Sequence, residues 1–217
     1  DNGIILAGPI GIETLNAFRR EFSGALQNFG FPPCPGDVMV RNPAWSKPLA
    51  DYLADFRRWI TLPGEAAHMN VAIFCDAQAV AGDAGLLNAA KAALLDLIRS
   101  EQAFLAHFAR AVDAFGTPIG LFNNLITSEG AGDALDLKKG GIFPIVHGVR
   151  SLAIEQGLLD TSTEKRIARL RDLGVLRAEF ARDLSQAFLF LLMLRLDAQL
   201  AASAGASGTL IRPAQLS

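Results

Sequence analysis

Short apolar runs alternate with helix-like stripes over the first 84 residues of the chain. Residues 2–7 and 70–75 are compact apolar segments of the kind that form buried strands, and residues 38–41 are a further candidate strand. Apolar side chains at three- and four-residue spacing predict helices over residues 13–28 and 48–60. This part is therefore expected to mix strands and helices, with segments 2–7 and 70–75 in one sheet.

From residue 85 onward, the apolar positions follow the period of helices alone. They predict helices over residues 87–97, 104–115, 142–156, 161–174 and 178–202. Amphipathic helices joined by short connections are typical of a helical bundle. The pattern predicts an α+β chain, with an α/β domain over residues 1–84 and a mostly helical domain over residues 85–217.

One apolar run, residues 187–194, is unusually continuous. A membrane span needs about 20 apolar residues, so we interpret this run as the buried side of a core helix and expect no membrane partner. The opening residues, DNGIIL, lack the basic segment and long apolar stretch of a signal peptide. Because the chain starts without Met, directly in a strand-like run, we expect a further segment upstream of Asp1.

Composition narrows the class of protein. With 51% apolar and 19% charged residues, the 217-residue chain does not have the composition of a disordered protein. Its 20 Lys and Arg and 22 Asp and Glu residues give a net charge of −2. This charge argues against non-specific electrostatic binding of nucleic acid. Two cysteines, Cys34 and Cys75, cannot form a disulfide scaffold, and their sparseness suits a cytoplasmic protein.

Two aspartates adjoin the two predicted buried strands. Asp1 directly precedes segment 2–7, and Asp76 directly follows segment 70–75. If the strands are neighbours in a sheet, the two carboxylates meet at one site, where oxygen ligands and bound phosphate would suit Mg²⁺. The alternative is that these residues only begin and end strands, as Asp commonly does.

Longer ordered motifs carry a resemblance to a known family. The segments CPGDVMVRNPAW (34–45), FRRWI (56–60) and IFCDAQAVAGD (73–83) resemble the bacterial nucleotidyltransferase family of the signal-transduction type, which often accompanies cyclic-nucleotide-binding and CBS domains. ALDLKKGGIFPIVHGVRSLAIEQG (134–157), STEKRIARL (162–170) and AFLFLLMLRLDAQL (187–200) resemble its companion substrate-binding domain. The resemblance covers nearly the whole chain, and it implies a truncated nucleotidyltransferase-type α/β domain followed by a helical bundle.

The resemblance also implies a metal-dependent site. Asp1 matches the second aspartate of the family's active centre and Asp76 matches its third carboxylate, so both are expected to be catalytic and to bind Mg²⁺ or Mn²⁺. The Gly-Ser turn and first aspartate of that centre are not in this sequence, and a further C-terminal helix is expected after residue 217. The implied reaction moves a nucleoside monophosphate from a nucleoside triphosphate to an unknown acceptor, a protein or a small molecule. The alternative function is an inactive regulatory or protein-interaction module that keeps the fold.

Basic residues supply candidates for substrate binding. Lys138 and Lys139 precede a Gly-Gly helix entry, where backbone amides and ammonium groups can bind a nucleotide phosphate; the alternative is a solvated turn. Arg41, followed by Asn42, is a further candidate beside the expected site, although a structural role in positioning a loop is favoured for Asn42.

Arg150 is the remaining candidate, one helical turn after His147. It could fork onto a phosphate, or it could pair with an acidic residue such as Glu155 or Asp136. We expect Lys138 or Arg150 to point into a cleft between the two domains, on the side facing Asp76.

Overall fold

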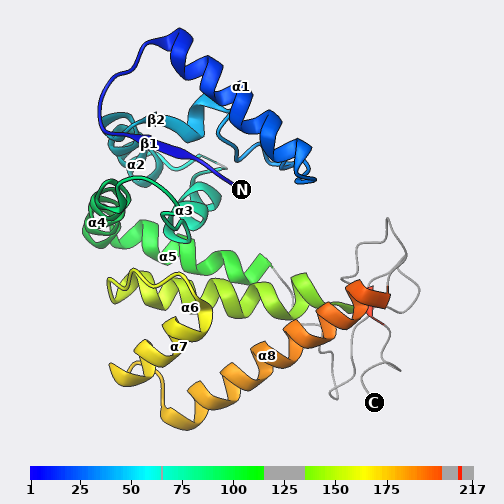
Figure 1. The fold of residues 1–217 in the computed structure, drawn as a ribbon. Helices are drawn as coiled ribbons and strands as arrows, with labels where there is room; N and C mark the ends of the chain where they lie inside the picture. Colours follow the sequence, from blue (N-terminus) through cyan, green and yellow to red (C-terminus); the bar gives the residue numbers. More distant parts are fainter. Residues whose placement is uncertain (65, 115–134, 202–209, 212–217) are drawn as a thin grey trace. The chain divides into compact units, whose positions relative to one another are not determined.

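The computed structural model describes residues 1–64, 66–114, 135–201 and 210–211 (Figure 1). The chain divides into two compact units, Asp1–Glu101 and Gln102–Ser217, which are considered separately below. The described parts are mostly helical, with a small parallel sheet in the first unit, so the expected α+β class with a helical C-terminal part is confirmed.

The sheet of the first unit has two parallel strands. In β1 (Ile4–Leu6) and β2 (Ser46–Pro48), Ile4 lies opposite Ser46 and Leu6 opposite Pro48. Parallel strands need a crossover connection, which here includes α1 (Ile12–Asn28) and the 3-10 turn η1 (Pro43–Trp45). The predicted strand 2–7 and helix 13–28 are both confirmed.

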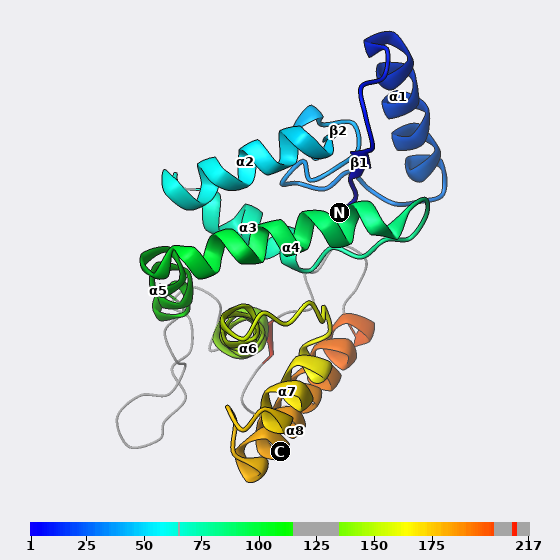
Figure 2. The same ribbon diagram turned by 90° about the vertical axis from the view of Figure 1, so that its left-hand side faces the viewer.

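Helices form the rest of the first unit. They are α2 (Leu49–Thr61), α3 (Ala67–Cys75) and α4 (Ala84–Ser100), and α2 packs against both of the others (Figure 2). The buried phenol of Tyr52 donates a hydrogen bond to the Ile4 carbonyl at 3.2 Å, tying α2 to β1. Burial raises the pKa of this phenol, so it stays protonated and keeps its donor.

Two of the predicted strands are wrong. Segment 70–75 lies within helix α3, whose Val71, Phe74 and Cys75 are buried. A short, continuously apolar run is compatible with a buried helix as well as with a buried strand, and its periodicity does not distinguish the two. Segment 38–41 is a turn whose backbone groups bond locally and to Asn2 instead of to a sheet.

Helix α4 belongs to the first unit, so the compact units divide after Glu101 and not between residues 84 and 85. The reason is packing. Ala90, Leu94 and Ile98 on one face of α4 are fully buried, and α4 lies alongside α2. The predicted separation between helices 87–97 and 104–115 is present, because α4 ends at Ser100 and α5 (Gln102–Arg110) begins after it.

The second unit is built from helices. Gly157 follows α6 (Phe143–Glu155) with φ of 69°, and Gly174 follows α7 (Thr163–Asp172) with φ of 73°. This is the left-handed conformation in which glycine ends helices at no steric cost. Two residue pairs form the short antiparallel ladder β3–β4. The described elements are α5 (Gln102–Arg110), η2 (Ala111–Ala114), β3 (Leu135–Asp136), the π-helical turn η4 (Lys138–Ile142), α6 (Phe143–Glu155), α7 (Thr163–Asp172), α8 (Ala178–Ala201) and β4 (Leu210–Ile211).

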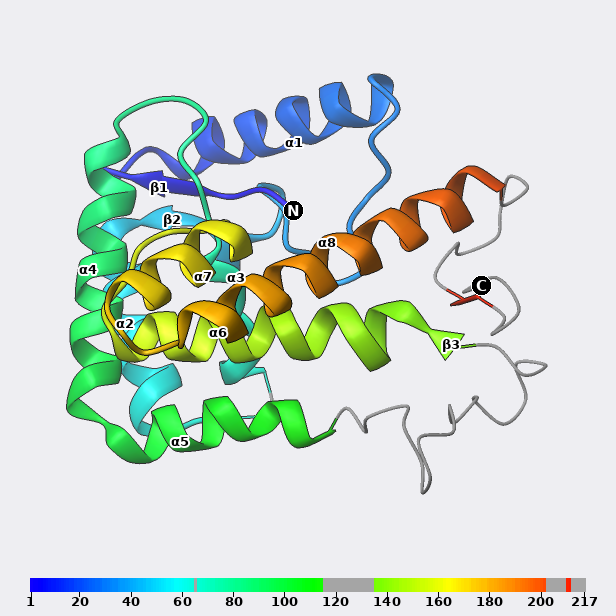
Figure 3. The same cartoon turned by 90° about the horizontal axis from the view of Figure 1, so that it is seen from below.

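Helix α8 is the orange helix in Figure 3, and its side chains are less buried than those of the core helix that was expected. Of its described side chains, Ala181 and Phe188 are buried, whereas several large apolar side chains in and beyond the run 187–194 are about half exposed or more. By length and composition alone, α8 is the one helix in the described part of the chain that is long and apolar enough to cross a membrane. More apolar side chains of α8 therefore remain exposed than are buried in the core of this unit.

Candidate functional site

The backbone beside Asp1 is held by Asn2. The Asn2 amide donates to the Val38 carbonyl at 3.0 Å, and the Asn2 side-chain carbonyl accepts from the Val40 amide at 2.7 Å. These bonds fix segment 38–40 along the start of β1. Asp1 itself is exposed, so its carboxylate is accessible.

The loop after this segment carries Arg41. Its Nε donates to the Asp37 carboxylate at 2.8 Å, in an exposed pair of the kind that adds little stability. Asp37 has φ of 51°, an uncommon conformation for a residue with a side chain. Asn42 accepts from the Ala44 amide and donates to the Asp37 carbonyl, so the favoured structural role of Asn42 is confirmed. Arg41 therefore directly follows the residues that bond to Asn2, and its described side-chain partner is Asp37.

Asp76 lies at the C-terminal end of α3, half-buried. Its amide donates to the Ala72 and Ile73 carbonyls, which continues the helix ladder through this residue. Asp76 therefore follows a helix and not a strand, so the prediction that two neighbouring strands bring Asp76 to Asp1 is wrong. That the carboxylates of Asp1 and Asp76 meet at one site stays a prediction.

Lys91 is a residue at this end of α3 that sequence analysis missed. It is 5% exposed, and its Nζ donates to the Cys75 carbonyl at 2.9 Å, directly before Asp76. A cation at a helix C-terminus interacts favourably with the helix dipole. The sequence indicates the burial of Lys91, because this residue lies four positions after Leu87 and three before Leu94 on the apolar stripe of α4.

Carboxylate oxygens have the chemistry that Mg²⁺ prefers. Within the described residues, no three His, Cys, Asp or Glu side chains gather as a metal site. Two carboxylates suffice for Mg²⁺ when substrate phosphates and water complete its octahedral shell. Asp1 and Asp76 fit such a site by donor type.

The lysine pair lies where it was expected, at the start of a helix. Lys138 and Lys139 open η4, which runs directly into α6, and both side chains are exposed. Their backbone amides already donate to one carboxylate oxygen of Asp136, at 2.9 and 3.0 Å. An anion bound here would therefore meet the ammonium groups, because Asp136 occupies these two amides.

Arg150 and His147 lie on the buried side of α6. His147 is 3% exposed, with Nε2 2.6 Å from the Phe108 carbonyl and its ring stacked on Phe143 at a centroid separation of 5.7 Å. Arg150 is 7% exposed. Because Lys138 and Arg150 belong to the second unit and Asp76 to the first, their expected placement in a shared cleft stays a prediction.

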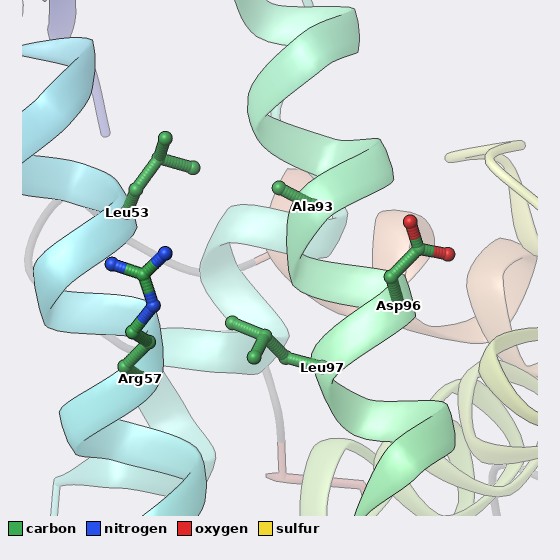
Figure 4. A pocket seen from close by; sticks show the side chains of 5 residues that line it. All are labelled: Leu53, Arg57, Ala93, Asp96 and Leu97. Atoms are coloured by element: carbon green, nitrogen blue, oxygen red, sulfur yellow. The ribbon is translucent and has the colours of Figure 1, made fainter.

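A shallow hollow of about 330 Å³ lies between α2 and α4 of the first unit (Figure 4). Leu53, Ala93 and Leu97 point into the space between the helices, whereas Asp96 points away from it. The hollow contains none of the predicted site residues, and Arg57 and Asp96 are the charged residues of its lining.

The first unit contains a parallel sheet and the second is helical. The sequence motifs of both units are those of a nucleotidyltransferase-like protein. Residues 102–217 match the family model described as Putative nucleotidyltransferase substrate binding domain, and residues 1–66 match Putative nucleotidyltransferase DUF294. The chain belongs to this family, as the sequence motifs predicted. Comparison with curated proteins and with solved structures found no match.

Proposed function

We propose that the protein transfers a nucleoside monophosphate from a nucleoside triphosphate to an acceptor hydroxyl, with Mg²⁺ or Mn²⁺. The observation that carries the proposal is the presence, in one chain, of both the nucleotidyltransferase motif region and the substrate-binding domain. Asp1 and Asp76 are the proposed catalytic and metal-binding residues. We further propose a cytoplasmic signalling role, with a protein as the acceptor and cyclic-nucleotide-binding or CBS domains as neighbours in the complete protein.

The proposed reaction is an in-line displacement at the α-phosphorus. The acceptor oxygen forms a bond to the α-phosphorus while the bond from that phosphorus to the bridging oxygen of the β-phosphate breaks. Pyrophosphate leaves, and the hydroxyl proton passes to solvent. The metal, when bound, would neutralise phosphate charge and lower the pKa of the acceptor hydroxyl. Asp1 and Asp76 would supply its protein ligands.

Calorimetric titration of the full-length protein with a panel of nucleoside triphosphates, with and without Mg²⁺, tests this function. We expect one or more triphosphates to bind in the presence of Mg²⁺ and to bind much more weakly when EDTA is added. Absence of binding by every triphosphate would contradict the proposal.

Lys138 and Lys139 are proposed to hold part of the triphosphate charge that the metal leaves uncovered. Because both ammonium groups are exposed, replacing both with Ala should weaken triphosphate binding about three- to tenfold at low salt and by less at high salt. Calorimetry at two salt concentrations measures this change. The double variant Arg171→Ala and Arg177→Ala removes two exposed charges elsewhere and serves as the control; an equal loss in both double variants would show only a general charge effect.

Arg150 is proposed to bind a phosphate oxygen. Because Arg150 is buried, removing the whole side chain in Arg150→Ala should lower thermal stability as well as triphosphate affinity. Arg150→Met keeps most of the volume without the charge, and Arg150→Lys keeps the charge. We expect the Met variant to bind triphosphate about tenfold more weakly and the Lys variant to retain most of the affinity. If both variants bind normally but unfold more easily, Arg150 is a structural ion-pair partner.

A non-catalytic interaction module is the second candidate, and the exposed apolar surface of α8 favours it. In that case the family fold would serve to present a binding surface. Triphosphate binding without any Mg²⁺-dependent transfer to cell-extract proteins or small molecules would favour this candidate.

A further inference from the structure

Helix α8 is apolar on two sides. Its inner side contributes Leu191, Leu194 and Ala198, which pack against Leu135 and Leu137. A second set of apolar side chains lies on the outer side, exposed by 46–75% of their surface. This set is called the α8 stripe; its members are Leu189, Phe190, Met193, Leu196 and Leu200.

The spacing of the α8 stripe is that of a helix-pairing seam. Leu189, Met193, Leu196 and Leu200 follow one another at intervals of four, three and four residues. At 3.6 residues per turn, these four positions fall within an arc of about 60° on one side of the helix. This is the a/d pattern by which one helix packs its side chains against another.

The extent of the α8 stripe suits a protein partner better than a bilayer. From Leu189 to Leu200 it is about 17 Å long, whereas the hydrocarbon core of a membrane is about 30 Å thick. Arg182 and Gln186 continue the same side of the helix toward its N-terminus, and exposed Asp197 flanks the seam. These polar side chains would have to leave water if the helix entered lipid.

We infer that the α8 stripe is the contact between two copies of this chain. In a dimer with a twofold axis, both copies contribute the same surface to the interface. The stripe of one copy can therefore pack against the stripe of the other, and no different partner surface is needed. If fully covered, the five side chains would bury at most about 600 Å² per copy, or about 1,200 Å² in a pair, which is the lower end of specific protein interfaces. Two α8 helices therefore pack stripe to stripe, and this assembly does not depend on the proposed function.

Sedimentation velocity of the full chain tests this dimer. We expect a species of 46.2 kDa, twice the 23.1 kDa of one chain, at about 10 μM protein. Met193→Glu with Leu196→Glu should give a monomer, because each copy would bring two charges into the seam. Phe180→Glu is the control, because Phe180 is 50% exposed on the opposite side of the same helix, and it should leave the dimer intact.

The milder pair Met193→Ala and Leu196→Ala covers the case in which the Glu variant does not fold. It should raise the dissociation constant of the dimer about tenfold or more, with an unchanged circular dichroism spectrum. A monomeric wild-type chain at 100 μM, or equal dimerisation in the wild-type chain and the Ala pair, would overturn the inference. So would a monomer that sediments with anionic vesicles through the same residues, which would assign the stripe to a membrane.

Discussion

Replacing Asp76 with Asn should reduce nucleotidyl transfer about 100-fold or more, the largest functional effect expected of any single substitution here. The change removes one carboxylate charge and leaves the size of the side chain almost unchanged. Since this chain would supply two carboxylates to the proposed site, losing one would halve the charge that its own side chains contribute to holding the metal. Transfer of a radiolabelled nucleoside monophosphate, measured over a range of Mg²⁺ concentrations, gives the effect.

Asp83→Asn is the matched control for this experiment. Asp83 caps the start of α4, where its carboxylate accepts from the Gly85 amide at 2.7 Å, and Asn serves equally well at such a position. The control should therefore keep both stability and activity. Equal transfer rates in the Asp76→Asn variant and the wild type, in protein that folds normally by circular dichroism, would remove Asp76 from the metal site.

Phe56→Ala should lower the free energy of unfolding of the first unit by about 3–5 kcal/mol. Phe56 is fully buried, with its ring centroid 4.7 Å from that of Phe74 and 5.5 Å from that of Trp59. The substitution empties the centre of an aromatic cluster that joins α2 to α3, the helix that carries Asp76. Urea unfolding followed by circular dichroism measures the loss.

Phe29→Ala deletes the same atoms from a side chain that is 77% exposed, and it should change stability by less than about 0.5 kcal/mol. A similar loss in both Phe variants would mean that the cluster around Phe56 is not the core of this unit. A transition that moves only in the second unit would contradict the assignment of Phe56 to the first.

The helices were largely predictable because their apolar side chains recur at helical spacing over ten or more residues. Segments 13–28, 48–60 and 142–156 agree closely with α1, α2 and α6. Glycines at the ends of α6 and α7 were also informative, since each adopts a conformation that stops a helix.

The misassigned segments show where local pattern stops being informative. In α3, Val71, Ile73 and Phe74 favour strands by residue type, but packing against α2 selects the helix. Segment 38–41 finds its backbone partners in Asn2, 36 or more residues earlier in the chain, which no local pattern reveals. The residue types of the candidate site followed from the sequence motifs, whereas the contact of Lys91 with the end of α3 required the structure.

Both tryptophans of the chain, Trp45 and Trp59, lie in the first unit, where each is 8% exposed. Their rings are 6.2 Å apart, and Trp59 adjoins Phe56. Emission excited at the red edge of the indole band therefore comes from this unit alone, with no contribution from residues 102–217. The protein thus carries an intrinsic optical reporter of its nucleotidyltransferase-like half, with which melting or ligand-induced shifts in that half can be separated from events in the helical half without an added dye.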